Sequence, residues 1–285
     1  MALSLAVVLG LIAMVCYGVA DFFVARATQE ARVFDVLLWS KVVSVTLLGG
    51  ALMTVFRVPS VSGNTAVLVV IAGLLNVAAY LAFYRGIQVG KLSLVSPVAS
   101  AWGAVTAIIG VVVLGEVLMS IQAAAIGVVV AGTVLASFRW KDLRGLRWKN
   151  YEVGIEHGAV ALFSWGVSFA IINVLVGRMG WLPAVFAVLA VLLLAMAGYG
   201  MAAGRELSPP EAYRPVLLIG VAEAIAYVAL GTGLARFEAA LVAPLAAAFP
   251  MVTVLLASLF LEEPLDSNQW AGILAIIAGV VVLSL

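Results

Sequence analysis

Glu223 carries a carboxyl group in the middle of an apolar stretch, about eleven residues from either end of the segment 212–234. Placing an ionisable side chain inside hydrocarbon costs about 2.5–3.5 kcal/mol on insertion scales, so such residues are candidates for function. A carboxyl group there can bind a substrate ammonium or exchange a proton for substrate. It can also be a structural group that is hydrogen-bonded between helices. The sequence leaves both interpretations open.

Tyr227 follows Glu223 by four residues, which places both side chains on one face of a helix. The segment 65–86 holds Asn76 and Tyr80 at the same spacing. We expect these four residues to line one cavity from two sides. Trp165 is a further candidate for the wall of that cavity, as are the aromatic residues Trp102 and Phe249.

Asp21 and Lys41 form a second charged set, each ten residues from Ala31 in the first connection. Antiparallel helices joined by that turn would hold the two side chains at similar depth. Because intramembrane charges usually pair with one another, we expect an ion pair between them. A role in gating or in substrate binding is the alternative.

The elements that hold these residues are predicted to be membrane-spanning helices. Of the 285 residues, 65% are hydrophobic and 10% are charged, whereas a soluble domain carries about 25% charged residues. A helix needs about 20 apolar residues to cross the hydrocarbon of a bilayer. Ten segments meet this requirement: 3–25, 33–55, 65–86, 92–115, 119–138, 153–176, 181–203, 212–234, 239–261 and 268–285. The sequence thus predicts an all-α, multi-pass integral membrane protein, located in the cell membrane.

An internal repeat divides the chain into two halves of five segments. Of the 62 positions from 76 to 137, 22 are identical to the position 147 residues later, against about 6 expected by chance. The first segments match at a shift of 148, with Gly10 on Gly158 and Gly18 on Gly166. Because five crossings is an odd number, the second half must enter the membrane from the opposite side. The prediction is two inverted five-helix repeats around a central cavity, an arrangement typical of transporters.

The order of several short motifs resembles the drug/metabolite transporter superfamily, in particular its ten-helix EamA-type members. The motifs are Tyr17-Gly18, Trp165-Gly166, Ala79-Tyr80 through Gly86, Ser96-Pro97, Ala243-Pro244, Leu114-Gly115-Glu116, Leu261-Glu262-Glu263, and the stretches Gln122 to Gly132 and Gln269 to Gly279. The resemblance implies a carrier of small metabolites, and many members export amino acids or drugs. It also implies that the last helix of each half packs at the periphery. We expect repeats at 1–141 and 153–285, joined by a basic loop at 142–152.

Pro97 and Pro244 lie inside the fourth and ninth segments, where each removes a backbone hydrogen bond. We expect a kink at each, either static or flexible. Glu116 and Glu263 end the same segments, and we interpret them as capping residues near the starts of the following helices.

Several functional classes receive no support from the sequence. It contains no P-loop, no zinc-protease pair and no nucleophile elbow. One histidine and one cysteine make a metal site improbable, and we expect no cofactor and no nucleic acid as partner. Small residues recur every fourth position at Ala123, Gly127 and Ala131, which permits a homodimer.

The function that these patterns favour is secondary transport by alternating access, with export of amino acids or related compounds. The alternative is a non-transporting membrane protein, such as an assembly partner or a sensor. The side on which the termini lie is left open, because the positive-inside count and the family's usual topology disagree.

Overall fold

The fold is known from a computed structural model, which describes residues 2–55, 62–89, 92–140, 152–211, 213–262 and 264–284. All but one residue of the predicted basic loop 142–152 therefore lies outside the described residues, as does Glu263. The described chain is helical: α1 (Ala2–Ala27), α2 (Val33–Val55), α3 (Gly63–Val89), α4 (Leu92–Ser100), α5 (Trp102–Val112), α6 (Ser120–Ala136), α8 (Glu152–Met179), α9 (Trp181–Ala202), α10 (Tyr213–Leu234), α11 (Ala239–Ala247), α12 (Pro250–Phe260) and α13 (Ser267–Ser284).

All ten predicted membrane segments are helical in the structure. Eight helical stretches are long and apolar enough to cross a membrane, and the remaining two are shorter apolar helices. Large apolar side chains such as Leu74, Leu194 and Leu274 point outward and are more than half exposed. Lipid accepts these side chains without cost, and a helix satisfies its own backbone hydrogen bonds there. The protein is therefore a multi-pass integral membrane protein.

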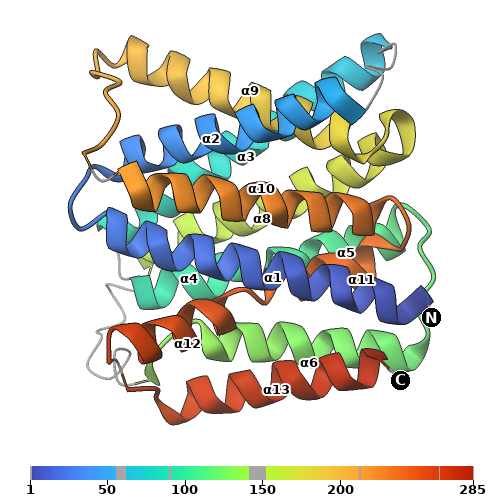
Figure 1. Cartoon of the computed structure of the whole chain (residues 1–285). Coiled ribbons are helices and arrows are strands. Elements are labelled where there is room, and N and C mark those ends of the chain that lie inside the picture. The colour runs from blue at the N-terminus through green and yellow to red at the C-terminus, as the bar shows by residue number, and fades with distance from the viewer. Residues whose placement is uncertain are drawn as a thin grey trace.

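The two halves pack against each other reciprocally, as a two-fold axis in the membrane plane requires. Helix α1 packs against α10 and, in the equivalent contact, α8 packs against α3. The contact of α2 with α10 likewise has its equivalent in the contact of α9 with α3. Helices α6 and α13 pack together at one edge of the bundle (Figure 1). The last helix of each half thus lies at the periphery, and the predicted inverted repeat is confirmed.

One pair of contacts shows the symmetry at atomic detail. The hydroxyl of Thr106 donates to the carbonyl of Gly166 at 3.0 Å, and its repeat counterpart Thr253 donates to the carbonyl of Gly18 at 3.2 Å. Both glycines sit where a Cβ would collide with the facing helix. The glycines in the motifs Tyr17-Gly18 and Trp165-Gly166 are thus explained by the close approach of α1 to α12 and of α8 to α5.

The fourth and ninth segments are each divided into two helices, but not at the prolines. Helix α4 continues through Pro97 and α11 through Pro244. The interruptions fall four residues later, at Ala101 (φ −76°, ψ 8°) and at its counterpart Ala248 (φ −76°, ψ 9°). A bend at Pro97 and at Pro244 stays a prediction, and the backbone leaves helical geometry at a different place, where the two broken helices cross. Two residues after each break lie Gly103, which is in close contact with the facing helix α11, and Pro250, the first residue of α12.

The small-residue stripe Ala123, Gly127 and Ala131 lies on the exposed face of α6. No side chain of the described residues covers Gly127, since nothing lies within 4 Å of a Cβ built there. A homodimer through this face stays a prediction.

The close approach of α10 to α2 at Gly220 gives a test of the fold. A Cβ at Gly220 would lie 2.5 Å from the Cβ of Val43 and 2.7 Å from the carbonyl oxygen of Ser40. We expect Gly220→Leu to lower the free energy of unfolding by at least about 1–3 kcal/mol, the usual cost of overpacking. Thermal unfolding of the purified protein in detergent measures this cost. The control Gly127→Leu, on the open face, should unfold at the wild-type temperature, and equal behaviour of the two variants would contradict the described packing.

Candidate functional site

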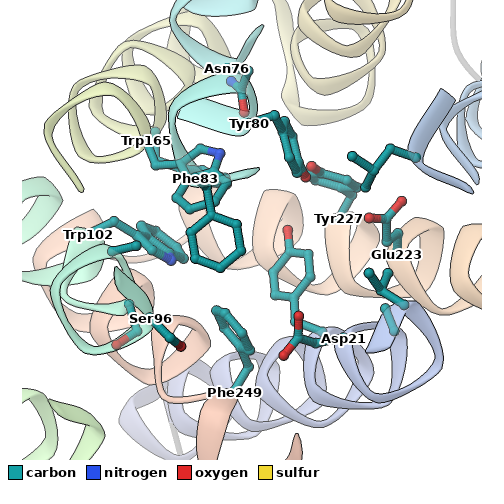
Figure 2. A pocket seen from close by; sticks show the side chains of 17 residues that line it. Asp21, Asn76, Tyr80, Phe83, Ser96, Trp102, Trp165, Glu223, Tyr227 and Phe249 are labelled. Atoms are coloured by element: carbon teal, nitrogen blue, oxygen red, sulfur yellow. The ribbon is translucent and has the colours of Figure 1, made fainter. Parts of the chain in front are cut away.

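A central cavity lies between the two halves and contains most of the residues singled out from the sequence (Figure 2). The space open to water centres is about 110 Å³. One water needs about 10–15 Å³ on this measure, so the cavity has room for several waters or a small organic molecule. Its lining includes Asp21, Asn76, Tyr80, Trp165, Glu223 and Tyr227. The remaining lining residues are Tyr17, Ala20, Val24, Leu37, Phe83, Ser96, Ala99, Ser100, Trp102, Phe169 and Phe249.

The ammonium group of Lys41 on α2 forms an ion pair with the carboxylate of Glu223 on α10. Lys41 is fully buried and Glu223 is 7% exposed. The Ser44 hydroxyl, one turn along α2 from Lys41, donates to the other carboxylate oxygen at 3.3 Å. Both charges are therefore compensated inside the protein, which is the condition under which lipid-embedded charges are tolerated.

The expected ion pair between Asp21 and Lys41 does not form, because helix packing places their elements apart. Helix α10 lies between α1 and α2 and packs extensively on both (Figure 1). The helix next to Lys41 is therefore α10, and Lys41 pairs with a carboxylate of that helix rather than with one of α1. A sequence-neighbour argument could not find this partner, because Glu223 is 182 residues from Lys41.

Tyr80 and Tyr227 extend the polar network into the cavity. The ring of Tyr80 lies 4.8 Å from the ammonium nitrogen of Lys41, within the range of a cation–π interaction. The hydroxyl groups of Tyr80 and Tyr227 are hydrogen-bonded to each other. These repeat-equivalent tyrosines, one from each half, thus meet across the cavity (Figure 2).

Asn76 joins α3 to α8 through Ser168, a residue that the sequence analysis did not single out. The side-chain amide of Asn76 donates to the hydroxyl of Ser168, and that hydroxyl donates to the carbonyl of Ala72 at 2.9 Å. Asn76 is the repeat counterpart of Glu223, but the two residues contact different helices of the opposite half: Asn76 bonds to the first one, α8, and Glu223 pairs with the second one, α2. A buried amide needs partners, which is the signal that could have drawn attention to the small hydroxyl residues of α8.

Asp21 stands on the cavity wall without a cationic partner among the described residues. Its polar neighbour is the hydroxyl of Thr253 on α12. Figure 2 shows its carboxylate on the same side of the cavity as Phe249. The carboxyl group that can be offered to a bound molecule is therefore that of Asp21, since the carboxylate of Glu223 is already paired.

Aromatic rings form most of the remaining wall. Tyr80 and Phe83 contact Trp165 with ring centroids 5.2 Å and 5.6 Å apart. Trp102 stacks on Phe169 with centroids 4.3 Å apart. The cavity is therefore apolar and aromatic with a few polar groups, the composition that is typical of sites for small organic ligands.

The comparisons with known proteins agree with this architecture. Residues 4–138 and 153–285 each match the EamA-like transporter family. The chain belongs to the EamA-like transporter family. It is thus a membrane transporter of a family that is not a family of enzymes. A solved structure, titled only as the crystal structure of a protein, is 16% identical and has a TM-score of 0.81 over 98% of both chains, which supports the fold. No curated protein matched the sequence.

In this EamA-family chain the motif Leu114-Gly115-Glu116 acts across the two halves. The Glu116 carboxylate accepts hydrogen bonds from the backbone amides of Ala239 at 3.0 Å and Ala240 at 2.7 Å. Glu116 therefore caps α11 of the other half. The sequence had suggested a cap on the following helix, α6. The Asn173 side chain of α8 donates to the Glu116 carboxylate at 2.9 Å. Gly115, at φ +72°, takes the left-handed conformation that turns the chain back at this point.

The described residues offer no cluster of three or more metal-ligating side chains.

The Lys41–Glu223 pair can be tested through stability. We expect Lys41→Met to lower the free energy of unfolding by about 3–5 kcal/mol, because it leaves a buried carboxylate unpaired. The double variant Lys41→Met with Glu223→Gln should recover a large part of this loss. Thermal unfolding in detergent gives both values.

A matched control is Arg32→Met, which removes the partly exposed pair with Asp35. That change should cost about 1 kcal/mol or less. Equal unfolding temperatures for the single and the double variants at Lys41 would show that the two groups are not coupled.

Proposed function

We propose that the protein is a secondary transporter that moves small metabolites by alternating access, and that it exports amino acids or related compounds. The observation that carries the proposal is an unequal closure of the cavity at its two ends. The direction and the cargo follow from the family resemblance, and the mechanism is argued from the packing of the broken helices.

Helix α5 packs closely against α11, at the end of the molecule that carries both termini. The symmetry-related contact would join α12 to α4, and no comparable packing occurs between these two described helices. The cavity accordingly extends toward the opposite end, where Val24, Phe83 and Ser96 line it. We interpret these two repeat-related contacts as gates in different states, one closed and one not.

Gly103 makes the closed gate possible. A Cβ at this position would lie 2.8 Å from the Cα of Pro244 and 2.9 Å from the carbonyl oxygen of Ala243. The backbones of α5 and α11 therefore cross in direct contact. Only glycine allows this approach without a displacement of one helix.

Glu116 adds a polar latch to the same gate. Its three hydrogen bonds join the loop after α5 to the start of α11 and to α8. Hydrogen bonds to a charged group contribute about 1.5–3 kcal/mol, and the carboxylate also faces the positive end of α11. Loss of these bonds would release α11 from α5 and open the terminal end of the cavity.

Exchange of the two conformations between the halves would close the far end and open the terminal end. Inverted repeats make this exchange possible because both conformations are already present in one molecule. A solute or proton gradient would supply the driving force. The midplane cavity would be the position of the solute throughout.

We expect Glu116→Ala to open the terminal gate, because the latch is lost. The measurement is the labelling rate of a cysteine placed at Ala247, which is 3% exposed and faces Gly103, in a Cys16→Ser background. A loss of about 1.5 kcal/mol in gate closure should raise the rate about tenfold. The control Glu206→Ala, which removes an exposed carboxyl group outside the helices, should leave the labelling rate unchanged. Equal labelling rates in Glu116→Ala and in this control would contradict the proposed role of Glu116 in closing the gate.

Solute flux tests the proposed function itself. Proteoliposomes that contain the wild-type protein should accumulate or release a small amine or amino acid faster than empty liposomes do. Gly103→Val, which obstructs the crossing of α5 and α11, should reduce that flux severalfold. A protein that binds solute yet gives no flux with either solute class would favour the alternative of a non-transporting sensor or assembly partner.

A further inference from the structure

The charges around the central cavity are unequal. Its lining contains two carboxylates, Asp21 and Glu223, and no Lys, Arg or His among the described residues. The charge of Glu223 is compensated by Lys41, which is fully buried behind it. The remaining charge that a bound molecule meets is therefore the negative charge of Asp21.

A second polar group of α1, the hydroxyl of Tyr17, also faces the cavity. The hydroxyl of Tyr17 is buried and has no hydrogen-bond partner among the described residues. Tyr17 precedes Asp21 by four residues, so both side chains lie on the face of α1 that lines the cavity. An unpaired buried hydroxyl is costly, and a ligand group can relieve the cost.

The repeat shows what is special about this side of the cavity. At the shift of 148 that relates Gly18 to Gly166, the counterpart of Asp21 is Phe169. Phe169 stacks on Trp102, and the counterpart of Trp102 is Phe249. One of these two repeat-related positions thus holds two stacked rings, whereas the other holds one ring, Phe249, beside the carboxylate of Asp21 (Figure 2). The missing second ring leaves a place for an aromatic group of the ligand.

We infer that the transported solute is an organic amine with an aromatic or other flat apolar group, bound through its ammonium by Asp21. The Tyr17 hydroxyl supplies a hydrogen bond, and the surrounding rings offer cation–π and stacking contacts. This inference rests on the proposed transport function and narrows its cargo. A zwitterionic amino acid would bring a carboxylate into a cavity whose described lining has no cationic side chain to receive it. The site therefore discriminates in favour of amines that lack a carboxylate.

The experiment compares two solutes that differ by one carboxylate, 2-phenylethylamine and phenylalanine. Binding to the purified wild-type protein is measured by calorimetry and by quenching of tryptophan fluorescence, since Trp102 and Trp165 line the cavity. We expect the amine to bind at least tenfold more tightly than the amino acid. Equal or tighter binding of phenylalanine would overturn the inference, and this comparison needs no variant to fold.

The variants locate the binding to Asp21. Asp21→Asn should weaken amine binding at least tenfold, and Asp21→Glu should restore part of it. The control Glu30→Gln removes an exposed carboxyl group just beyond the same helix and should bind as the wild type does. Unchanged binding in Asp21→Asn would overturn the assignment of the ammonium site.

Flux separates this inference from the proposed function. Amine binding that depends on Asp21, without flux in proteoliposomes, would leave the site in place and remove the transport proposal. Flux of phenylalanine that exceeds flux of the amine would retain transport and overturn the amine specificity.

Discussion

A charge inside a bilayer needs a partner within the protein, and in this chain Lys41 and Glu223 neutralise each other in an ion pair. The pair joins α2 of the first half to α10 of the second half, and the ring of Tyr80 covers its ammonium group. Tyr80 is in turn bonded to Tyr227, so the position of the aromatic wall depends on the ion pair. Because Glu223 is compensated in this way, Asp21 is left as the carboxylate that faces the cavity. The chemistry of the site thus follows from where one lysine finds its counter-charge.

Duplication and inversion explain why the cavity exists at all. Each half presents its first and third helices to the other half, and the glycines of these helices allow reciprocal close contacts. The polar positions in the middle of the third helix of each half are thereby brought to the same depth. Divergence between the halves then produced different functions at equivalent positions, such as an amide at Asn76 and a carboxylate at Glu223. The symmetry supplies the framework, and the departures from it supply the specificity.

Much of this could be predicted from the sequence. The ten segments follow from hydropathy, the inverted halves follow from the repeat, and the grouping of Asn76, Tyr80, Glu223 and Tyr227 follows from helical spacing combined with the repeat. The partner of Lys41 could not be predicted, because it depends on α10 being inserted between α1 and α2. The breaks at Ala101 and Ala248 could not be predicted either, since they arise where the backbone of Gly103 crosses that of Pro244, a contact between the two halves. The role of Glu116 was missed for the same reason: its cap belongs to a helix of the other half.

The paired interruptions at Ala101 and Ala248 affect how such a molecule can move. At each one the turn is held by a bond from the alanine amide to the carbonyl three residues earlier, at 3.3 Å and 3.2 Å. In the proposed transport cycle, a break of this kind would let the two helices of a segment move separately. One end of the cavity would then widen while the other helix of the same segment keeps its contacts. The outer helices then need not slide through the lipid. In the proposed mechanism, rearrangement would be confined to short helices of nine and eleven residues in each half.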